Sequence, residues 1–167
     1  DVEHGTVLTD RLIRIDNGRI TAITPYAPPP AGAAVTDWSG YTVLPGLIDM
    51  HTHLSDTEQS ANPAEPLLHS EADIAFLAAA HARATLNAGF TSVRDVGTFR
   101  AFGDVALRNA IDAGAVPGPR MAVAGAYLTV PGGGGEVTGF APDVTVPASM
   151  RMGVFSGPQE ARDRTRF

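Results

Sequence analysis

Two histidines separated by one residue end a short apolar segment, Pro45-Gly46-Leu47-Ile48-Asp49-Met50-His51-Thr52-His53. The segment has the length and character of a β-strand, in which alternate side chains lie on the same face. His51 and His53 would then lie together, close enough to share one cation. Neutral imidazole is the commonest protein ligand for divalent transition metals. The spacing therefore predicts a metal site at the end of this strand, with His51 and His53 as two of its ligands.

Three further side chains are candidates for contact with a substrate or for support of the metal ligands. Asp49 shares the parity of the two histidines, so it would either orient a ligand or form a structural hydrogen bond. Asp95 closes a second apolar segment, and we expect it to pair with Arg94 or to cap the following loop, with support of a ligand as the alternative. His69 lies in the loop after the first strand, where it would face the substrate or be an ordinary loop histidine.

Strands and helices alternate from Pro45 onward, which is typical of βαβ units and a parallel sheet. The predicted strands are residues 45–53, 90–96 and 120–125, and the predicted helices are residues 71–88 and 101–113. We predict the α/β class, with residues 45–167 forming the first part of a (β/α)8 TIM-like barrel. Active sites of such barrels lie at the carboxyl ends of the strands.

Residues 1–44 are rich in strand signals. Arg11–Ile15 and Arg19–Ile23 alternate polar and apolar residues around Asp16-Asn17-Gly18, which favours a hairpin. Val35–Trp38 and Tyr41–Leu44, on either side of Ser39-Gly40, suggest a second hairpin. We expect this region to be part of a small β-sandwich domain.

Polar residues mark the predicted helix ends. Ser70, with Asp73 three residues later, is typical of a helix start, and Gly89 of a helix end. His81 falls on the apolar face of this helix and is expected to be a core histidine. Ser156 would begin a last helix that the chain leaves early, at Phe167, so we expect the amino-terminal part of a longer protein.

A connection rich in Gly and Pro covers residues 126–155 and includes four consecutive glycines, Gly132 to Gly135. A phosphate-binding P-loop is excluded because no Lys-Ser/Thr pair follows the glycines. We expect a mobile loop near the mouth of the site. Glu136 in this loop could meet a cationic group of a substrate.

Composition narrows the class of protein. The 167 residues are 44% hydrophobic and 18% charged, with a net charge of −6, which argues against a general nucleic-acid binder. The chain has no cysteine, so any metal needs nitrogen or oxygen ligands, which suits zinc, manganese, iron or nickel. No apolar run is long enough to span a membrane. The compartment is not fixed by the sequence, and a soluble, cytoplasmic protein is the expectation.

The motif Pro45–His53, followed by Leu54, resembles the first-strand signature of the amidohydrolase superfamily. Gly89-Phe90-Thr91-Ser92-Val93-Arg94-Asp95-Val96-Gly97 resembles the second strand of one branch, the metal-dependent dipeptidases and carboxypeptidases that act on Xaa-Pro and related N-acyl amino acid substrates. Gly118-Pro119-Arg120-Met121 and Ala124-Gly125 resemble the third strand of that branch. The hairpin over Leu12–Ile23 is similar to the β-sandwich that precedes the barrel in these enzymes.

The resemblance implies a centre of one or two divalent metal ions, with zinc as the expected metal. His51 and His53 match the two first-strand ligands. The remaining ligands and the catalytic residues, namely an often carboxylated lysine, two histidines and an aspartate, would lie beyond Phe167. Relatives in this branch commonly carry a histidine in the glycine-rich loop, whereas Thr129–Glu136 has none.

The resulting hypothesis is hydrolysis of an amide bond in a dipeptide or N-acyl amino acid by metal-activated water, in a protein that could form homo-oligomers. One alternative is a mononuclear deaminase or cyclic-amide hydrolase of the same superfamily. The other is a catalytically inactive barrel that serves as an assembly protein. A lysine at the end of the fourth strand would favour the binuclear hydrolase, and a lack of stoichiometric metal would favour the inactive barrel.

Overall fold

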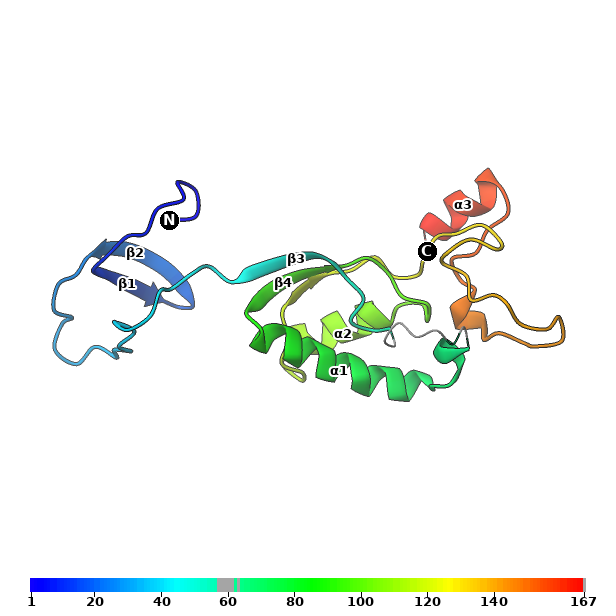
Figure 1. Ribbon diagram of the computed structural model, residues 1–167, viewed down its shortest axis with the longest axis horizontal. Helices are drawn as coiled ribbons and strands as arrows, with labels where there is room; N and C mark the ends of the chain where they lie inside the picture. Colours follow the sequence, from blue (N-terminus) through cyan, green and yellow to red (C-terminus); the bar gives the residue numbers. More distant parts are fainter. Residues whose placement is uncertain (57–61, 63, 167) are drawn as a thin grey trace. The chain divides into compact units, whose positions relative to one another are not determined.

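The computed structural model describes residues 1–56, 62 and 64–166 of the chain (Figure 1). They form two compact units, Asp1–Pro45 and Gly46–Phe167. Each unit has its own sheet. No helix in the described parts of the chain is long and apolar enough to cross a membrane.

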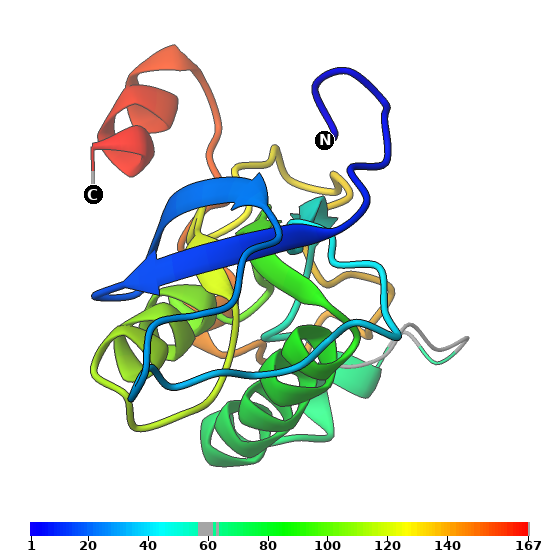
Figure 2. The same cartoon turned by 90° about the vertical axis from the view of Figure 1, so that its left-hand side faces the viewer.

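The first unit contains an antiparallel hairpin of β1 (Arg11–Asp16) and β2 (Arg19–Pro25), which appears as the two blue arrows of Figure 2. Asn17 and Gly18 both have positive φ angles, 47° and 72°. Two such residues in succession give a type I′ turn, whose twist matches that of the two strands. The predicted hairpin is confirmed.

The second predicted hairpin is wrong, because residues 35–44 contain no strand. The predicted turn is present, since the Tyr41 N–H donates to the Trp38 carbonyl at 2.9 Å. The apolar side chains around this turn are all exposed in the structure: Val35, Trp38, Tyr41, Val43 and Leu44. Neither Ser39 nor Gly40 has a positive φ angle, so this turn is not of the type I′ or II′ that matches the twist of two hairpin strands.

The second unit is built on a parallel sheet of β3 (Leu47–Thr52), β4 (Phe90–Asp95) and β5 (Arg120–Ala122), in the order β3-β4-β5. Two helices, α1 (Glu71–Asn87) and α2 (Gly103–Asp112), connect the strands and lie on one face of the sheet (Figure 1). They pack side by side (Figure 2). The predicted α/β class is confirmed.

The core of this unit lies between the sheet and the two helices. Its buried members are Leu54, Ala78, Ala82, Val93 and Leu107, with Phe90, Ile111, Val116 and Met121 packed against them. Two of these residues, Ala78 and Ala82, are one turn apart on α1, so they present a flat surface to the strands. Their small side chains allow α1 to lie close to β4.

The ends of α1 follow the sequence signals. The Asp73 N–H donates to Ser70 Oγ at 3.2 Å, and the Ser70 N–H donates to Asp73 Oδ2 at 2.9 Å, which forms a capping box. Gly89 follows with φ 96°, a conformation that favours glycine. The predicted start and end of this helix are confirmed.

Two other helix starts differ from the prediction. Helix α2 begins at Gly103 rather than Ala101, because Phe102 has a left-handed backbone with φ 67°. The last helix, α3 (Pro158–Thr165), has Gly157 and not Ser156 at its N-cap. The backbone N–H of Ser156 instead donates to Glu160 Oε2 at 2.6 Å.

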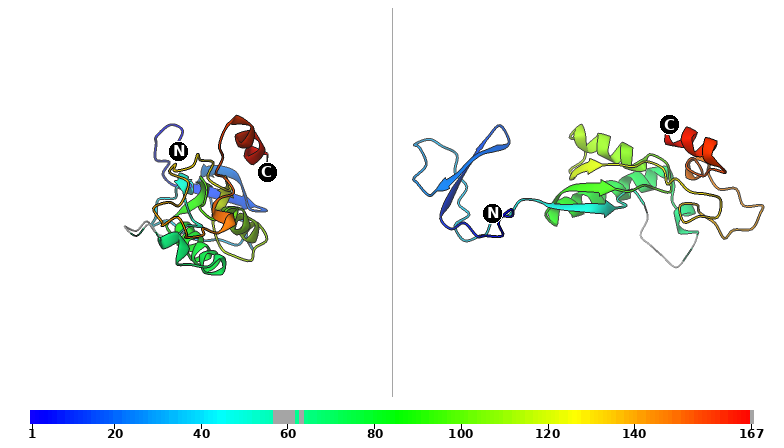
Figure 3. Two further views of the ribbon diagram at one scale, coloured as in Figure 1. Left: turned by 90° about the vertical axis from the view of Figure 1, so that its right-hand side faces the viewer. Right: turned by 90° about the horizontal axis from the view of Figure 1, so that it is seen from above.

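The connections that follow β3, β4 and β5 meet beyond the carboxyl ends of these strands (Figure 3). The first contains a short 3-10 helix, η1 (Glu65–Leu67). The long connection after β5 contains η2 (Ala148–Met150) and doubles back on itself, since the Phe155 N–H donates to the Thr129 carbonyl at 3.0 Å. The predicted mobility of this connection stays a prediction.

Candidate active site

His51 and His53 lie next to each other at the end of β3. Their ring centroids are 5.3 Å apart in an edge-to-face arrangement with an interplanar angle of 74°. His51 is exposed and His53 is half-buried. The pairing of β3 with β4 is irregular between Asp49 and Thr52, so the backbone that carries the two rings departs from regular strand pairing.

The Nδ1 atom of His53 is fixed by two neighbours from other loops. It lies 2.9 Å from the carbonyl oxygen of Gly97 and 2.7 Å from the hydroxyl oxygen of Tyr127. A carbonyl oxygen only accepts hydrogen bonds, so Nδ1 carries the proton. In neutral imidazole the other nitrogen, Nε2, then keeps its lone pair and can bind a metal ion.

Asp95 supports the main chain on both sides of this interaction. Its carboxylate is fully buried and accepts hydrogen bonds from the Leu54 N–H at 2.7 Å and the Gly97 N–H at 3.3 Å. It thus caps the loop after β4, one of the expected roles, and its bonds go to backbone groups rather than to Arg94. Burial raises the pKa of Asp95 to about 6, and the two N–H groups oppose this shift.

Asp49 forms a structural hydrogen bond, the second of its two expected roles. Its Oδ1 accepts from the backbone N–H of His51 at 3.0 Å. The carboxylate is thus bonded to the main chain of a candidate ligand. This bond fixes the backbone from which the His51 ring projects.

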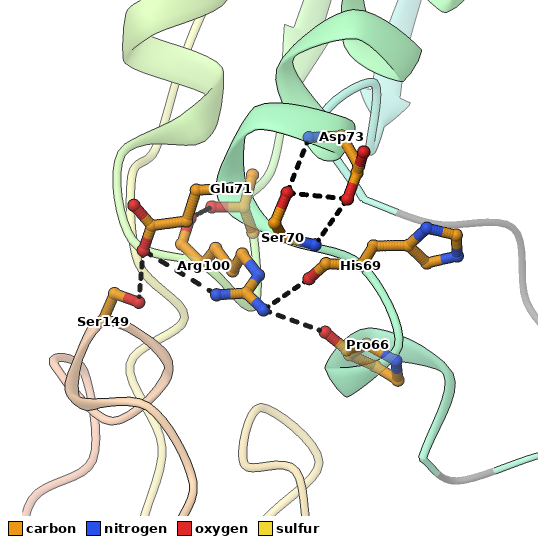
Figure 4. A network of polar contacts seen from close by, with 8 residues as sticks. Pro66, His69, Ser70, Glu71, Asp73, Arg100 and Ser149 are labelled. Atoms are coloured by element: carbon orange, nitrogen blue, oxygen red, sulfur yellow. Dashed lines mark hydrogen bonds and ion pairs between the residues drawn. The ribbon is translucent and has the colours of Figure 1, made fainter.

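The ring of His69 contacts Glu65, the first residue of η1. Its Nε2 lies 3.1 Å from Glu65 Oε1, while its carbonyl oxygen accepts from Arg100 Nη2 at 2.7 Å. Figure 4 shows the ring turned away from the guanidinium of Arg100. Within the part of the chain that the structure describes, no hydrogen bond or ring contact joins His69 to His51 or His53.

Arg100 connects the three loops at this edge of the sheet (Figure 4). Besides the carbonyl of His69, Nη2 contacts that of Pro66 at 3.4 Å, and Nη1 lies 3.7 Å from Glu71 Oε1. The same Glu71 oxygen accepts from Ser149 Oγ at 2.9 Å. The loop after β4 is therefore tied to the loop after β3 and to η2.

Asp56 and Tyr127 are site residues that the sequence analysis did not identify. The Tyr127 hydroxyl donates to Asp56 Oδ2 at 3.0 Å, and Asp56 Oδ1 accepts from the Phe99 N–H at 3.0 Å. Burial raises the pKa of Asp56, and burial together with the Asp56 carboxylate raises the pKa of Tyr127. The only available signal was their position just after strand ends, where sites of parallel α/β folds lie.

The side chains of His81 and Glu136 have structural roles. His81 Nδ1 lies 3.1 Å from the Leu54 carbonyl, so the predicted core histidine is satisfied inside the fold. Glu136 is not the predicted partner for a cationic substrate group. Its Oε1 lies 2.6 Å from Arg151 Nη1, and its Oε2 accepts from the Gly132 N–H at 2.7 Å, so its charge is compensated inside the loop.

The two imidazoles fit as part of a metal's ligand set. Zinc binds histidine nitrogen at about 2.0–2.1 Å and is usually held by three or four protein ligands. Among residues 1–56, 62 and 64–166, no group of three or more His, Asp or Glu side chains could hold a metal ion. The described residues therefore supply two candidate ligands, together with hydrogen bonds that fix each of them.

Residues 42–166 match the Amidohydrolase family. The chain belongs to this family. A crystal structure of a Xaa-Pro dipeptidase with bound methionine in the active site is 34% identical to this amidohydrolase chain, with a TM-score of 0.80, and the match covers 92% of this chain and 38% of that one. A prolidase complexed with N-methylphosphonate-L-proline is 31% identical, with a TM-score of 0.77, over 94% of this chain and 38% of that chain.

A match in sequence points to a second kind of amidohydrolase. The dihydroorotase of Geobacter sulfurreducens is 41% identical over 81 residues, which are 48% of this chain and 16% of that protein. This chain therefore spans well under half the length of the relatives that it matches. The resemblance seen in the sequence motifs is confirmed at the level of the family and by similarity to Xaa-Pro dipeptidase and prolidase structures.

Proposed function

We propose that this chain supplies the first part of a (β/α)8 barrel, preceded by part of a small β-sandwich. Three parallel strands in sequence order, with both crossover helices on one face, support this arrangement. Strand β3 lies at one edge of the sheet and exposes Leu47, Ile48 and Met50. Further strands and helices of a closed barrel would cover such side chains.

In this proposal His51 and His53 hold a divalent cation, with zinc as the expected ion. The Amidohydrolase family is generally metal-dependent, and the histidines of this chain suit that requirement. The observation that carries the proposal is the state of His53: Nδ1 is held by Gly97, which leaves Nε2 for the metal. A cation bound there would supply a Lewis acid that lowers the pKa of water and polarises a carbonyl group.

The proposed reaction is hydrolysis of an amide bond in a dipeptide or N-acyl amino acid. The similarity to a Xaa-Pro dipeptidase and to a prolidase, over more than nine-tenths of this chain, supports that substrate class. The part played by the described residues is to hold and orient the two ligands. Asp49 fixes the backbone of His51, while Asp95 fixes that of Leu54 beside His53.

A cyclic-amide hydrolase is the second candidate, because the dihydroorotase match is the higher in sequence identity. The two candidates differ in substrate and not in the role of His51 and His53. Assays of the full-length protein with an N-acyl proline, a Xaa-Pro dipeptide and dihydroorotate separate them. Turnover of dihydroorotate alone would replace the first candidate by the second.

Substitution of the two ligands tests the metal site. In the full-length protein, His51→Ala and His53→Ala should each lower metal content, measured by elemental analysis, and should lower activity more than about 100-fold. His4→Ala is the matched control, since His4 is largely exposed in the first unit and pairs with Asp1. Wild-type metal content and activity in the double variant would refute the proposal. A wild-type protein without stoichiometric metal would favour the inactive barrel.

A further inference from the structure

The hydroxyl of Tyr127 and the carboxylate of Asp56 form a chain of hydrogen bonds that ends on His53. Asp56 Oδ2 lies 3.0 Å from the Tyr127 hydroxyl, which lies 2.7 Å from His53 Nδ1. The three residues come from the loops after β3 and β5. The two contacts join residues that are 74 and 71 positions apart in the sequence.

The direction of each hydrogen bond follows from the chemistry of the partners. Gly97 offers His53 a carbonyl oxygen, so the Nδ1 proton points toward Gly97 and Tyr127. The tyrosine oxygen therefore accepts from His53, and its own proton goes to Asp56. An ionised carboxylate only accepts, so it holds the tyrosine proton away from the imidazole.

The second oxygen of Asp56 is also in use. Asp56 Oδ1 accepts from the Phe99 N–H at 3.0 Å, so the carboxylate has one oxygen for the loop after β4 and one for Tyr127. The ring of Phe99 packs edge-to-face on that of Tyr127, with centroids 5.1 Å apart. The carboxylate and the aromatic contact together fix where the hydroxyl lies.

We propose that Asp56 and Tyr127 are positioning residues for His53. Asp56 accepts the tyrosine proton, so the tyrosine oxygen accepts a hydrogen bond from His53 Nδ1. This arrangement leaves His53 Nε2 for the metal. The inference rests on the proposed function, since it assumes that His53 is a ligand. In this proposal neither Asp56 nor Tyr127 contacts the metal or the substrate. Their effect is on the tautomer and the rotation of the imidazole ring.

Asp56→Asn distinguishes positioning from simple cross-linking of loops. The Phe99 N–H still requires an acceptor, so the amide oxygen turns to it and the amide nitrogen faces Tyr127. The tyrosine oxygen then accepts from the amide, and its proton is free to turn to His53 Nδ1. That bond favours the tautomer with the proton on Nε2. A protonated Nε2 has no lone pair with which to bind a metal ion. Tyr127→Phe added to Asp56→Asn removes the misdirected proton and leaves Gly97 as the acceptor.

The experiment measures the zinc dissociation constant of the full-length protein by competition with a chelator. Asp56→Asn should raise it about 10- to 100-fold, the range typical of groups that orient ligands. Tyr127→Phe should raise it by a smaller factor of more than about 2, and the double variant should bind zinc more tightly than Asp56→Asn alone. Tyr26→Phe is the control, because Tyr26 is exposed in the first unit.

Nitrogen-15 NMR of the histidine rings in the metal-free protein gives a second readout. The His53 signal, assigned by its loss in His53→Ala, should change from the Nδ1–H to the Nε2–H tautomer in Asp56→Asn and return in the double variant. A double variant that binds zinc no better than Asp56→Asn would overturn the inference. If Asp56→Asn does not fold, an unchanged dissociation constant in Tyr127→Phe would overturn it equally. Unchanged zinc binding in His53→Ala would instead refute the proposed function.

Discussion

The carboxylate of Asp95 accepts a hydrogen bond of 2.7 Å from the backbone N–H of Leu54, the residue that follows His53. The last residue of β4 therefore holds the chain as it leaves β3. The same buried carboxylate accepts from the Gly97 N–H, and the carbonyl of Gly97 contacts His53. One side chain thus stabilises both the backbone that follows the candidate ligand His53 and the loop that contacts its ring.

Replacement of Asp95 should affect both stability and metal content. Asp95→Ala leaves two buried N–H groups without an acceptor, at a cost of about 1–3 kcal/mol each. Asp95→Asn keeps one oxygen and should lose less. Denaturant unfolding of the full-length variants, with elemental analysis of bound metal, measures both effects. Wild-type stability in Asp95→Ala would contradict the role assigned to this carboxylate.

The stability of the protein should depend on pH through Asp95. Burial and the nearby carboxylate of Asp104 raise the pKa of Asp95 from 3.8 to about 6, while His53 and the two N–H donors oppose the shift. The folded protein therefore keeps a proton that the unfolded chain has lost. The contribution of Asp95 to the free energy of unfolding is fully present below about pH 4 and is lost as the pH rises to about 6.

Asp95→Asn removes this titration. The difference in unfolding free energy between wild type and Asp95→Asn should change between about pH 4 and 6 and stay constant above. Asp143→Asn, which changes an exposed carboxylate in the long connection, serves as the control. Parallel pH profiles for wild type and Asp95→Asn would show that Asp95 does not titrate in this range.

Arg100 should be sensitive even to a conservative change. Its guanidinium reaches two backbone carbonyls and the carboxylate of Glu71, and a lysine has no such fork of donors. Arg100→Lys should lower the free energy of unfolding by about 1–3 kcal/mol. Arg108→Lys, on a helix surface and 4.0 Å from Asp112, should cost less than about 1 kcal/mol. Equal losses in thermal unfolding of the two variants would argue against the network.

The start of α1 gives a prediction about a helix cap. Ser70→Ala removes the oxygen that accepts from the Asp73 N–H and should cost about 1 kcal/mol. Ser156→Ala should change the stability by less than about 0.5 kcal/mol, because Gly157 and not Ser156 is the N-cap of α3. Denaturant unfolding compares the two serine variants directly. A larger loss in Ser156→Ala would restore the cap expected from the sequence.

Gly97 is the glycine that the site requires. It has φ 122°, and a Cβ atom on it would lie 2.8 Å from Cδ1 of Tyr127. Gly97→Ala should therefore lower the stability and also weaken zinc binding by displacing the tyrosine from His53. Gly139→Ala is the control, since Gly139 also has a positive φ, 91°, but a Cβ there meets nothing within 4 Å. Equal zinc affinity in the two variants would separate Gly97 from the site.

Local signals predicted the elements that depend on near neighbours. The Asn17-Gly18 turn and the Ser70–Asp73 capping box each need contacts only across two or three residues, so the sequence contains what determines them. The second predicted hairpin failed because neither Ser39 nor Gly40 adopts the positive φ angle of a type I′ or II′ hairpin turn. The start of α2 moved because Phe102 adopts a left-handed backbone that residue preferences do not favour.

The sequence by itself determined that His51 and His53 stand together at a strand end, because their spacing and the apolar run before them are local. Only the tertiary structure decided which nitrogen of His53 is free. Gly97 and Tyr127 lie 44 and 74 residues further along the chain. They reach His53 because neighbouring parallel strands end at the same edge of the sheet, which brings their loops together. The candidate ligand His53 can thus be identified from the sequence, whereas its tautomer depends on the folded arrangement of three loops.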